Sequence, residues 1–320
     1  MRIDYFILKS IKKIYRKFFN TNKGEPIEFE KDPNVVCKEL VDLITSDKPI
    51  MVARYGATEL LCIVNYINIK KGRPNLREYF NTEDSDWWWA DNKLKQIEEL
   101  SGFFPATIQN VERFCELMID DSAQVDALAS WIDNEKYMQE YIADAYRFQG
   151  LLLDPFWSDT PWTVALKGKK VLVIHPFEDT IKSQYKKREL LFTNPDILPE
   201  FELKTIKAVQ SLGGNSEFST WFEALDYMKS EIDKIDFDIC LIGAGAYGFP
   251  LAAYVKRIGK KAIHVGGSLQ LVFGIRGKRW ENENYNEVYN YSKLMNEHWV
   301  KPAEQEKPRN ASNVEDACYW

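Results

Sequence analysis

The second half of the chain alternates short apolar runs with amphipathic segments, and this rhythm constrains the fold more than any other feature. The apolar runs are short and rich in Val, Ile and Leu, which is typical of buried strands. The predicted strands and helices follow one another at 170–175, 179–191, 203–209, 219–235, 237–242, 250–258 and 261–265. Strands that alternate with helices form βαβ units, whose strands lie parallel and bind ligands beyond their carboxyl ends. We therefore expect an α/β fold with a Rossmann-like, mainly parallel sheet and flanking helices.

The first half supplies one further strand-to-helix junction. Asp32 and Pro33 predict a helix start, because Asp is a favoured N-cap and Pro suits the first helical position. Residues 49–54 predict a short buried strand, and a helical pattern begins at Ala57. Residues 84–149 look mainly helical, so we interpret them as a helical insertion in the N-terminal half of the domain.

The first 19 residues form a basic amphipathic pattern. The apolar residues that recur there at helical spacing are Ile3, Ile7, Ile11, Ile14 and Phe18. Lys and Arg fill much of the remainder. Two interpretations stay open: the helix lies on an anionic membrane surface, or it packs on the body with its basic face in solvent. Since neither a signal peptide nor a spanning apolar run of about 18 residues is found, we expect a cytoplasmic protein, peripheral at the inner face of the cell membrane under the first interpretation.

These patterns divide the chain into three parts. Residues 1–30 are predicted to be the basic helix and a polar linker, and residues 31–300 the α/β domain. Residues 301–320 form a polar tail that ends in Tyr319 and Trp320. Because an aromatic end on a polar tail favours burial, we expect the tail to pack back on the body.

Charge and cysteine content exclude several classes of protein. The formal net charge is −6, whereas a general nucleic-acid binder has a basic surplus, so we expect no nucleic-acid partner. The five cysteines are scattered and contain no C-x-x-C pair. This pattern indicates neither a zinc site nor a disulfide framework, and buried free thiols are the simpler interpretation.

A glycine-rich loop follows the apolar run that ends at residue 242. Gly243, Gly245 and Gly248 have G-x-G-x-x-G spacing, with Tyr247 inside the loop and a helical pattern after it. Such a loop brings backbone N–H groups and a helix N-terminus close to phosphate. A dinucleotide site also needs an acidic residue about 20 positions later, and none stands there. The loop therefore favours phosphate or nucleotide over NAD, and the alternative is that its glycines serve only helix–strand packing.

Further candidate ligand contacts follow other predicted strands. In a parallel sheet the strand ends share one crevice, so side chains and glycines at these ends are expected to meet there. The residues concerned are His175, His264, Gly266, Gly267 and Gln270, with Arg276 close behind as a partner for a diphosphate. For each histidine, a hydrogen-bonded structural role remains the alternative to a catalytic one.

The segment Arg54-Tyr-Gly56-Ala57-Thr-Glu59 carries a family resemblance. It resembles the Arg-aromatic-Gly-Asp-x-Glu signature of bacterial glycosyltransferases with the GT-D fold. Residues 238–270 also resemble that family's strand, glycine turn, helix and following strand. The two segments cover about a third of the chain. The resemblance implies a nucleotide-sugar donor, with UDP-sugar favoured, and a glycan or lipid-linked acceptor.

The resemblance also implies a divalent metal, Mn or Mg, held by the Asp-x-Glu pair. Arg54, Gly56 and Glu59 match the signature, but Ala57 stands where the family has aspartate. Since a metal-bound diphosphate normally requires several hard oxygen ligands, two alternatives follow. Either Asp179 or Glu178, after another predicted strand, joins Glu59 at the metal, or basic residues neutralise the diphosphate instead. A helix-capping role for Glu59 is the structural alternative.

The sequence thus predicts a glycosyltransferase for bacterial surface polysaccharide or glycoconjugate synthesis. In this interpretation Glu59 is the catalytic base or metal ligand, and His264 or His175 assists the leaving group. A non-catalytic nucleotide-binding partner of a polysaccharide assembly complex is the main alternative, because Ala57 replaces an acid. An S-adenosylmethionine-dependent transferase that uses Gly243 to Gly248 is a third possibility.

Overall fold

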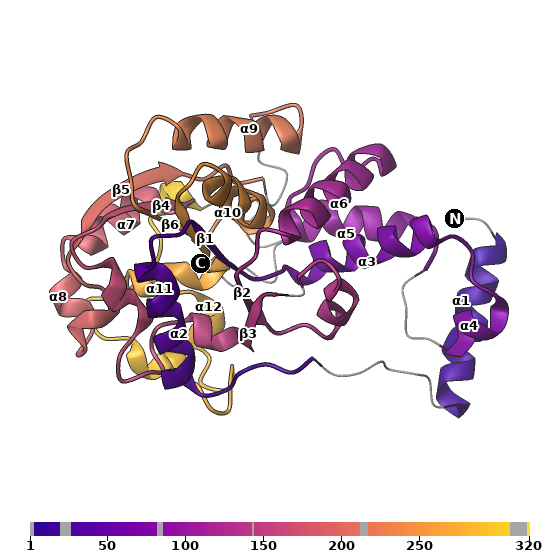
Figure 1. The fold of residues 1–320 in the computed structure, drawn as a ribbon, viewed down its shortest axis with the longest axis horizontal. Coiled ribbons are helices and arrows are strands. Elements are labelled where there is room, and N and C mark those ends of the chain that lie inside the picture. The colour runs from indigo at the N-terminus through magenta and orange to yellow at the C-terminus, as the bar shows by residue number, and fades with distance from the viewer. Residues whose placement is uncertain (1–2, 20–26, 82–85, 143, 212–216, 308–318) are drawn as a thin grey trace.

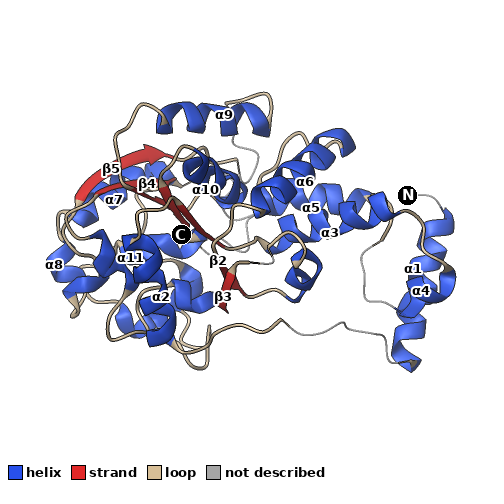
Figure 2. Cartoon of the chain, viewed as in Figure 1, coloured by secondary structure: helices blue, strands red, loops and turns tan. Residues whose placement is uncertain are grey.

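The computed structural model describes residues 3–19, 27–81, 86–142, 144–211, 217–307 and 319–320. Its centre is a seven-stranded sheet in the order β3-β2-β1-β7-β6-β4-β5, and every neighbouring pair is parallel. The strands are β1 (Ile50–Ala53), β2 (Ala127–Ser130), β3 (Tyr146–Gln149), β4 (Lys170–His175), β5 (Glu202–Lys207), β6 (Ile239–Ile242) and β7 (Lys261–His264). The sheet confirms the predicted α/β, Rossmann-like architecture (Figures 1 and 2).

Helices cover both faces of this sheet. The helices are α1 (Ile3–Phe18), α2 (Pro33–Thr45), α3 (Ala57–Lys71), α4 (Leu76–Asn81), α5 (Asp91–Ser101), α6 (Ile108–Ser122), α7 (Glu178–Tyr185), α8 (Arg188–Leu191), α9 (Trp221–Ile232), α10 (Gly248–Arg257), α11 (Leu269–Val272) and α12 (Lys278–Glu281). One apolar core joins the sheet to α3, α5, α6, α9 and α10. A second core joins its other face to α2, α7, α8, α11 and α12.

The chain reverses direction across the sheet between β4 and β6. β4 leads through α7, on one face, to the edge strand β5, whereas β6 leads through α10, on the opposite face, to β7. Because the two following helices diverge, the carboxyl ends of β4 and β6 open a crevice, which is where ligands bind in sheets of this kind.

Residues 84–149 are only partly the helical insertion that the sequence suggested. α5 and α6 lie in this stretch, but residues 127–130 and 146–149 form β2 and β3. β2 is a run of small residues, ALAS, and becomes a strand through its pairing with β1, where Val52 lies opposite Ala127. The prediction was wrong here because neither ALAS nor YRFQ contains the run of Val, Ile and Leu that marks the other strands.

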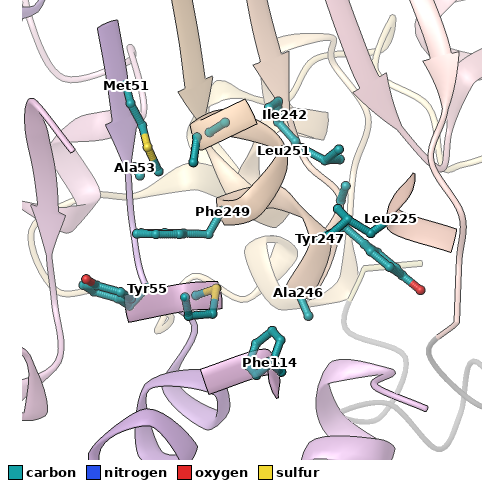
Figure 3. Packing of buried hydrophobic residues seen from close by; sticks show 14 of the residues in the cluster. Met51, Ala53, Tyr55, Phe114, Leu225, Ile242, Ala246, Tyr247, Phe249 and Leu251 are labelled. Carbon is teal, nitrogen blue, oxygen red and sulfur yellow. The ribbon is translucent and has the colours of Figure 1, made fainter. Parts of the chain in front are cut away.

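The β1–α3 junction packs tightly against α10. Tyr55 follows β1, and its ring stacks on that of Phe249 with centroids 4.8 Å apart. Its hydroxyl is 2.6 Å from the hydroxyl of Ser122 at the end of α6. Figure 3 shows Tyr55 beside Phe249, with Met51 and Ala53 of β1 above them in the view. This packing fixes the direction in which the chain leaves β1.

α1 and α4 lie together at one end of the molecule, away from the sheet (Figure 1). The loop before α5 joins them to α3, because Asn65 donates to the carbonyl of Trp88 at 3.1 Å. At the other end of the chain, Tyr319 and Trp320 pack on the body, where the Trp320 ring lies 6.2 Å from that of Phe177. Cys318 and the side chain of Ile3 lie outside the described part of the chain.

Candidate functional site

A cavity of about 610 Å³ opens at the carboxyl ends of the strands, and we call it the strand-end cavity. Six strands contribute the residue at or directly after their end, namely Arg54, Ser130, Gln149, His175, Gly243 and His264. Its walls are rich in aromatic side chains, including Trp131, Trp280, Tyr285, Tyr291, Tyr319 and Trp320. The volume lies within the range typical of small-molecule sites.

Arg54 places a cation in this cavity. It follows β1, and its guanidinium carbon lies 4.7 Å from the ring centroid of Trp131. Among the described residues, no hydrogen bond or ion pair engages the guanidinium. The position of the Trp131 ring is fixed, because its indole N–H donates to the Tyr55 carbonyl at 2.8 Å. A half-buried guanidinium stacked on a fixed indole is therefore available to an anion.

His175 is a neutral donor at the end of β4. Its Nδ1 accepts the backbone N–H of Phe177 at 3.0 Å, so the ring proton sits on Nε2. Burial lowers the pKa of His175 to about 3, which keeps the ring neutral at physiological pH. An ideal Cβ on Gly243 would lie 3.2 Å from Nε2, and no described residue accepts its proton. The Nε2–H group thus lies beside Gly243, where the ends of β4 and β6 meet.

The glycine-rich loop serves both the crevice and the packing. A side chain on Gly243 would lie 2.6 Å from His175 Cδ2 and 2.8 Å from the Gly266 carbonyl, so glycine is required there. Gly245 has a φ of +53° and open space around it, so its requirement is conformational rather than steric. A Cβ on Gly248 would overlap the His264 imidazole. Gly248 therefore serves helix–strand packing and does not line the cavity.

The loop that follows β7 forms another part of the cavity lining. His264, Gly266, Gly267 and Gln270 all line the cavity. His264 is buried, and burial lowers its pKa to about 3, aided by the positive charge of Arg54. Its Nδ1 has no hydrogen-bond partner among the described residues. Gln270 donates to the carbonyls of Ile275, Arg276 and Tyr319, which ties the loop to the C-terminal residues.

Glu59 lies in the first turn of α3, on the wall of the cavity. Its carboxylate folds back into the space that a side chain on Gly56 would occupy. Burial raises the pKa of Glu59 above its ordinary value, although its own backbone N–H and the nearby Ser101 oppose this shift. A carboxyl with a raised pKa at a cavity wall is suited to proton transfer.

Polar groups without partners gather around this cavity. Three cavity residues have a buried polar side-chain atom that finds no hydrogen-bond partner among the described residues: His264, Gln270 and Trp320. Buried polar groups in native proteins are nearly always paired. Their concentration here indicates a site built to hold a polar ligand.

A buried carboxyl, Asp154, also lines the cavity. Tyr291 donates its hydroxyl to Asp154 at 2.6 Å. Burial raises the pKa of Asp154, while Ser268, Tyr291 and the charge of Arg54 oppose this effect. The carboxyl is already hydrogen-bonded to protein, so it helps to shape the cavity wall rather than forming an open ligand set.

Besides Gly248, three of the residues expected at the site lie elsewhere. Asp179 is exposed in the first turn of α7, where its backbone N–H donates to Glu306 at 2.8 Å. Arg276 donates through Nε and Nη2 to the Trp299 carbonyl at 3.1 and 2.7 Å. Tyr247 turns into the core and stacks on Trp221, with centroids 4.9 Å apart. All three side chains lie outside the cavity.

The residues do not fit the expected divalent metal. Asp179 and Glu59 are not brought together, and Asp154 is bonded to Tyr291. Across the described residues, no group of three or more His, Cys, Asp or Glu side chains is arranged to hold a metal ion. The cavity instead offers the guanidinium of Arg54 and the N–H group of His175.

Several cavity residues escaped the sequence interpretation. Trp131 and Ser130 follow β2, which was not predicted, and Asp154 and Tyr291 lie in irregular segments. Trp131 carried no signal in the sequence, because its position at a strand end depends on β2. No local pattern indicated Asp154 or Tyr291.

Comparisons with known proteins find no matching family model and no matching curated protein. Two solved structures resemble the chain. One is described as a selenomethionine-substituted structure of domain of unknown function 1792; it is 12% identical, with 94% of this chain and 96% of that chain covered and a TM-score of 0.41. The other is described as this highly conserved domain having a distinct glycosyltransferase fold, at 12% identity, with coverage of 93% and 95% and a TM-score of 0.40. So distant a likeness assigns no residue role.

Proposed function

We propose that the chain is a glycosyltransferase that binds a nucleotide-sugar in the strand-end cavity. The observation that carries this proposal is the unpaired guanidinium of Arg54, which lies in the same cavity as the His175 donor. A cation and a neutral N–H donor beside two glycine turns suit the negative charge of a diphosphate. The exposed face of Trp131 and the other aromatic walls suit a nucleobase or sugar ring.

The site offers a complete set of roles for sugar transfer. An acceptor hydroxyl oxygen bonds to the anomeric carbon of the donor, and the bond from that carbon to the diphosphate oxygen breaks. The bonding pair leaves with the diphosphate, whose charge Arg54 and His175 stabilise. Glu59 takes the proton of the acceptor hydroxyl, and its raised pKa matches this task. His264 keeps the β7 loop in place against Gly248.

We infer that basic and neutral donors replace the metal in neutralising the diphosphate. Glu59 is the one residue of the expected metal pair that lines the cavity, since Asp179 lies outside it. Titration of UDP into the protein with Mn²⁺, with Mg²⁺ and with EDTA tests this inference. Equal affinity in the three conditions is expected, and binding that requires Mn²⁺ would contradict it.

The donor and acceptor belong to the same proposal. We favour a UDP-sugar and a glycan or lipid-linked acceptor in bacterial surface polysaccharide or glycoconjugate synthesis. Calorimetry with a panel of UDP-, GDP- and dTDP-sugars, followed by release of the free nucleotide with candidate acceptors, tests it. The proposal would be contradicted if no nucleotide-sugar bound. It would also be contradicted if S-adenosylmethionine bound and no nucleotide-sugar did.

A second candidate is a nucleotide-binding protein without turnover. Ala57 is the observation that favours it, because the position that carries an acid in the resembling family has a methyl group here. This candidate predicts tight UDP binding and no sugar release with any acceptor. Restoring the acid with Ala57→Asp and measuring metal-dependent turnover separates the two candidates.

A further inference from the structure

We propose that α1 docks in the interface of an anionic membrane, with an exposed apolar stripe turned toward the lipid. The stripe consists of Ile7, Ile11, Ile14 and Phe18, which are 49%, 46%, 59% and 77% exposed. Their spacing places them along one side of the helix. Soluble proteins seldom leave such a row of large apolar side chains in water unless it has a partner. Docking of α1 does not depend on transferase activity.

The opposite side of α1 is already committed to the protein. The Tyr5 ring stacks on that of Trp88, with centroids 4.3 Å apart and planes 11° apart. Lys12 is buried with its Nζ 4.1 Å from the centroid of the Tyr79 ring. These contacts hold α1 so that the stripe faces outward, and rotation of the helix to bury it would break them.

Two polar contacts extend this attachment along the helix. Lys9 forms an ion pair with Asp86 at 2.8 Å, and the Tyr15 hydroxyl donates to Asn81 at 2.7 Å. Both partners belong to α4 or to the loop that follows it. α1 is thus fixed to α4 and to the loop that follows it, so the stripe keeps its outward orientation.

Charge identifies the partner as an anionic surface. The first 19 residues contain six basic residues and one acidic residue, although the whole chain has a net charge of −6. Lys13, Arg16 and Lys17 are exposed on α1. Anionic lipid attracts such residues, each adding about fivefold to affinity. A second copy of the same basic helix would be repelled, which argues against a dimer through this face.

The length of α1 fits a helix that lies flat on the membrane. It has 16 residues, about 24 Å, and Lys and Arg recur throughout it. Among the described residues, no helix combines the length and apolar character needed to cross a bilayer. Phe6 and Phe19 are also exposed and add apolar area near the stripe. Interfacial helices have this combination of a basic face and aromatic or aliphatic side chains.

Vesicle co-sedimentation tests the docking surface. The full chain is expected to bind phosphatidylcholine vesicles that contain phosphatidylglycerol, to bind pure phosphatidylcholine weakly, and to lose binding as salt rises. Ile11→Asn with Ile14→Asn is expected to lower the affinity at least about tenfold, because two buried side chains are lost. Val288→Asn is the matched control, since Val288 is 78% exposed on the body of the protein.

A charge variant controls for the case in which the Asn substitutions disturb the folding of α1. Lys13→Glu with Lys17→Glu leaves the stripe and the supporting contacts intact, yet is expected to weaken binding to anionic vesicles at least about tenfold. Equal binding by the wild type and both variants would overturn the proposal, as would absence of vesicle binding. Sedimentation velocity tests the alternative that a second copy of the chain binds the stripe. A concentration-dependent dimer that Ile11→Asn abolishes, without vesicle binding, would assign the stripe to that second copy.

Discussion

The guanidinium of Arg54 lies over the indole of Trp131, 4.7 Å from its ring centroid, where the ends of β1 and β2 meet. The indole fixes one face of the cation, and the other polar edges remain open to the cavity. Adjacent parallel strands thus deliver the charge and its support from residues 77 positions apart. Since a stacked guanidinium is already positioned before a ligand arrives, little ordering is required on binding.

Replacement of Arg54 tests whether it binds the diphosphate. Arg54→Met is expected to weaken UDP affinity about 10- to 100-fold, because hydrogen bonds to charged groups contribute about 1.5–3 kcal/mol. Arg54→Lys should recover part of this loss, since charge is retained without the planar fork. Arg276→Met is the control, because Arg276 binds the Trp299 carbonyl outside the cavity. Equal UDP affinity in Arg54→Met and wild type by calorimetry would contradict the role.

His175 allows two variants that divide its hydrogen bonds. His175→Asn can still accept the Phe177 N–H but has no group at the position of Nε2, whereas His175→Gln can donate near Nε2. We expect Asn to lower kcat about 10²-fold or more, as for loss of one donor to a developing anion, and Gln to retain more activity. Equal losses in the two variants would point to a packing role instead.

Acid titration gives a second test of His175. Its pKa is about 3 in the folded protein and near 6.5 when unfolded, so the unfolded chain binds more protons between these values. The contribution of His175 to stability is therefore complete above pH 6.5 and declines as the pH falls toward 3. His175→Asn should lose less stability than wild type over this window, as measured by urea denaturation at pH 7 and pH 5.

Glu59→Gln separates catalysis from helix capping. As a base, Glu59 must be ionised, so activity should fall as the pH falls through its raised pKa, and the Gln variant should lose about 10²- to 10⁴-fold in turnover. Because the raised pKa means that ionisation is unfavourable in the folded state, Glu59→Gln should be at least as stable as wild type at pH 7. At a pH below the unfolded pKa of about 4.3 this difference should vanish. Near-normal turnover with a lowered Tm would assign Glu59 to capping alone.

Gly248 and His264 form a pair that a double-mutant cycle can measure. Gly248→Ala introduces a Cβ into the His264 imidazole, and overpacking of this kind costs about 1–3 kcal/mol. His264→Ala removes the ring and should tolerate the added methyl group. We expect a favourable coupling energy above 0.5 kcal/mol between the two changes, on the order typical of contacting residues. Additive effects in thermal denaturation would show that the ring can move aside.

Much of the sheet could be predicted from sequence where strands are long and apolar. Residues 170–175 were predicted as a strand and form β4 with the same bounds, because six consecutive residues carry the pattern. β2 (ALAS) and β3 (YRFQ) were missed because neither contains the run of Val, Ile and Leu that marks the predicted strands. Their strand character comes from tertiary contacts that no local window contains.

The candidate site was predicted best where a residue ends a strand. Arg54, His175 and His264 come together as the rule for parallel sheets requires. The rule failed for Asp179, four positions after β4, because the first turn of α7 had already directed that side chain into solvent. Trp131 was missed together with β2, since a residue cannot be assigned to a strand end before the strand is recognised.

The pairing of β1 with β7 has a consequence for folding during synthesis. Ile50 lies opposite Lys261, so β1 receives its second neighbour only after about 210 further residues have been made. Until then β1 has β2 on one side and an open edge on the other, and the loop that carries Gly266 and Gln270 does not yet exist. Ligand affinity therefore arises in a single late event, and a nascent chain that ends before residue 261 should be prone to aggregation and unable to bind nucleotide.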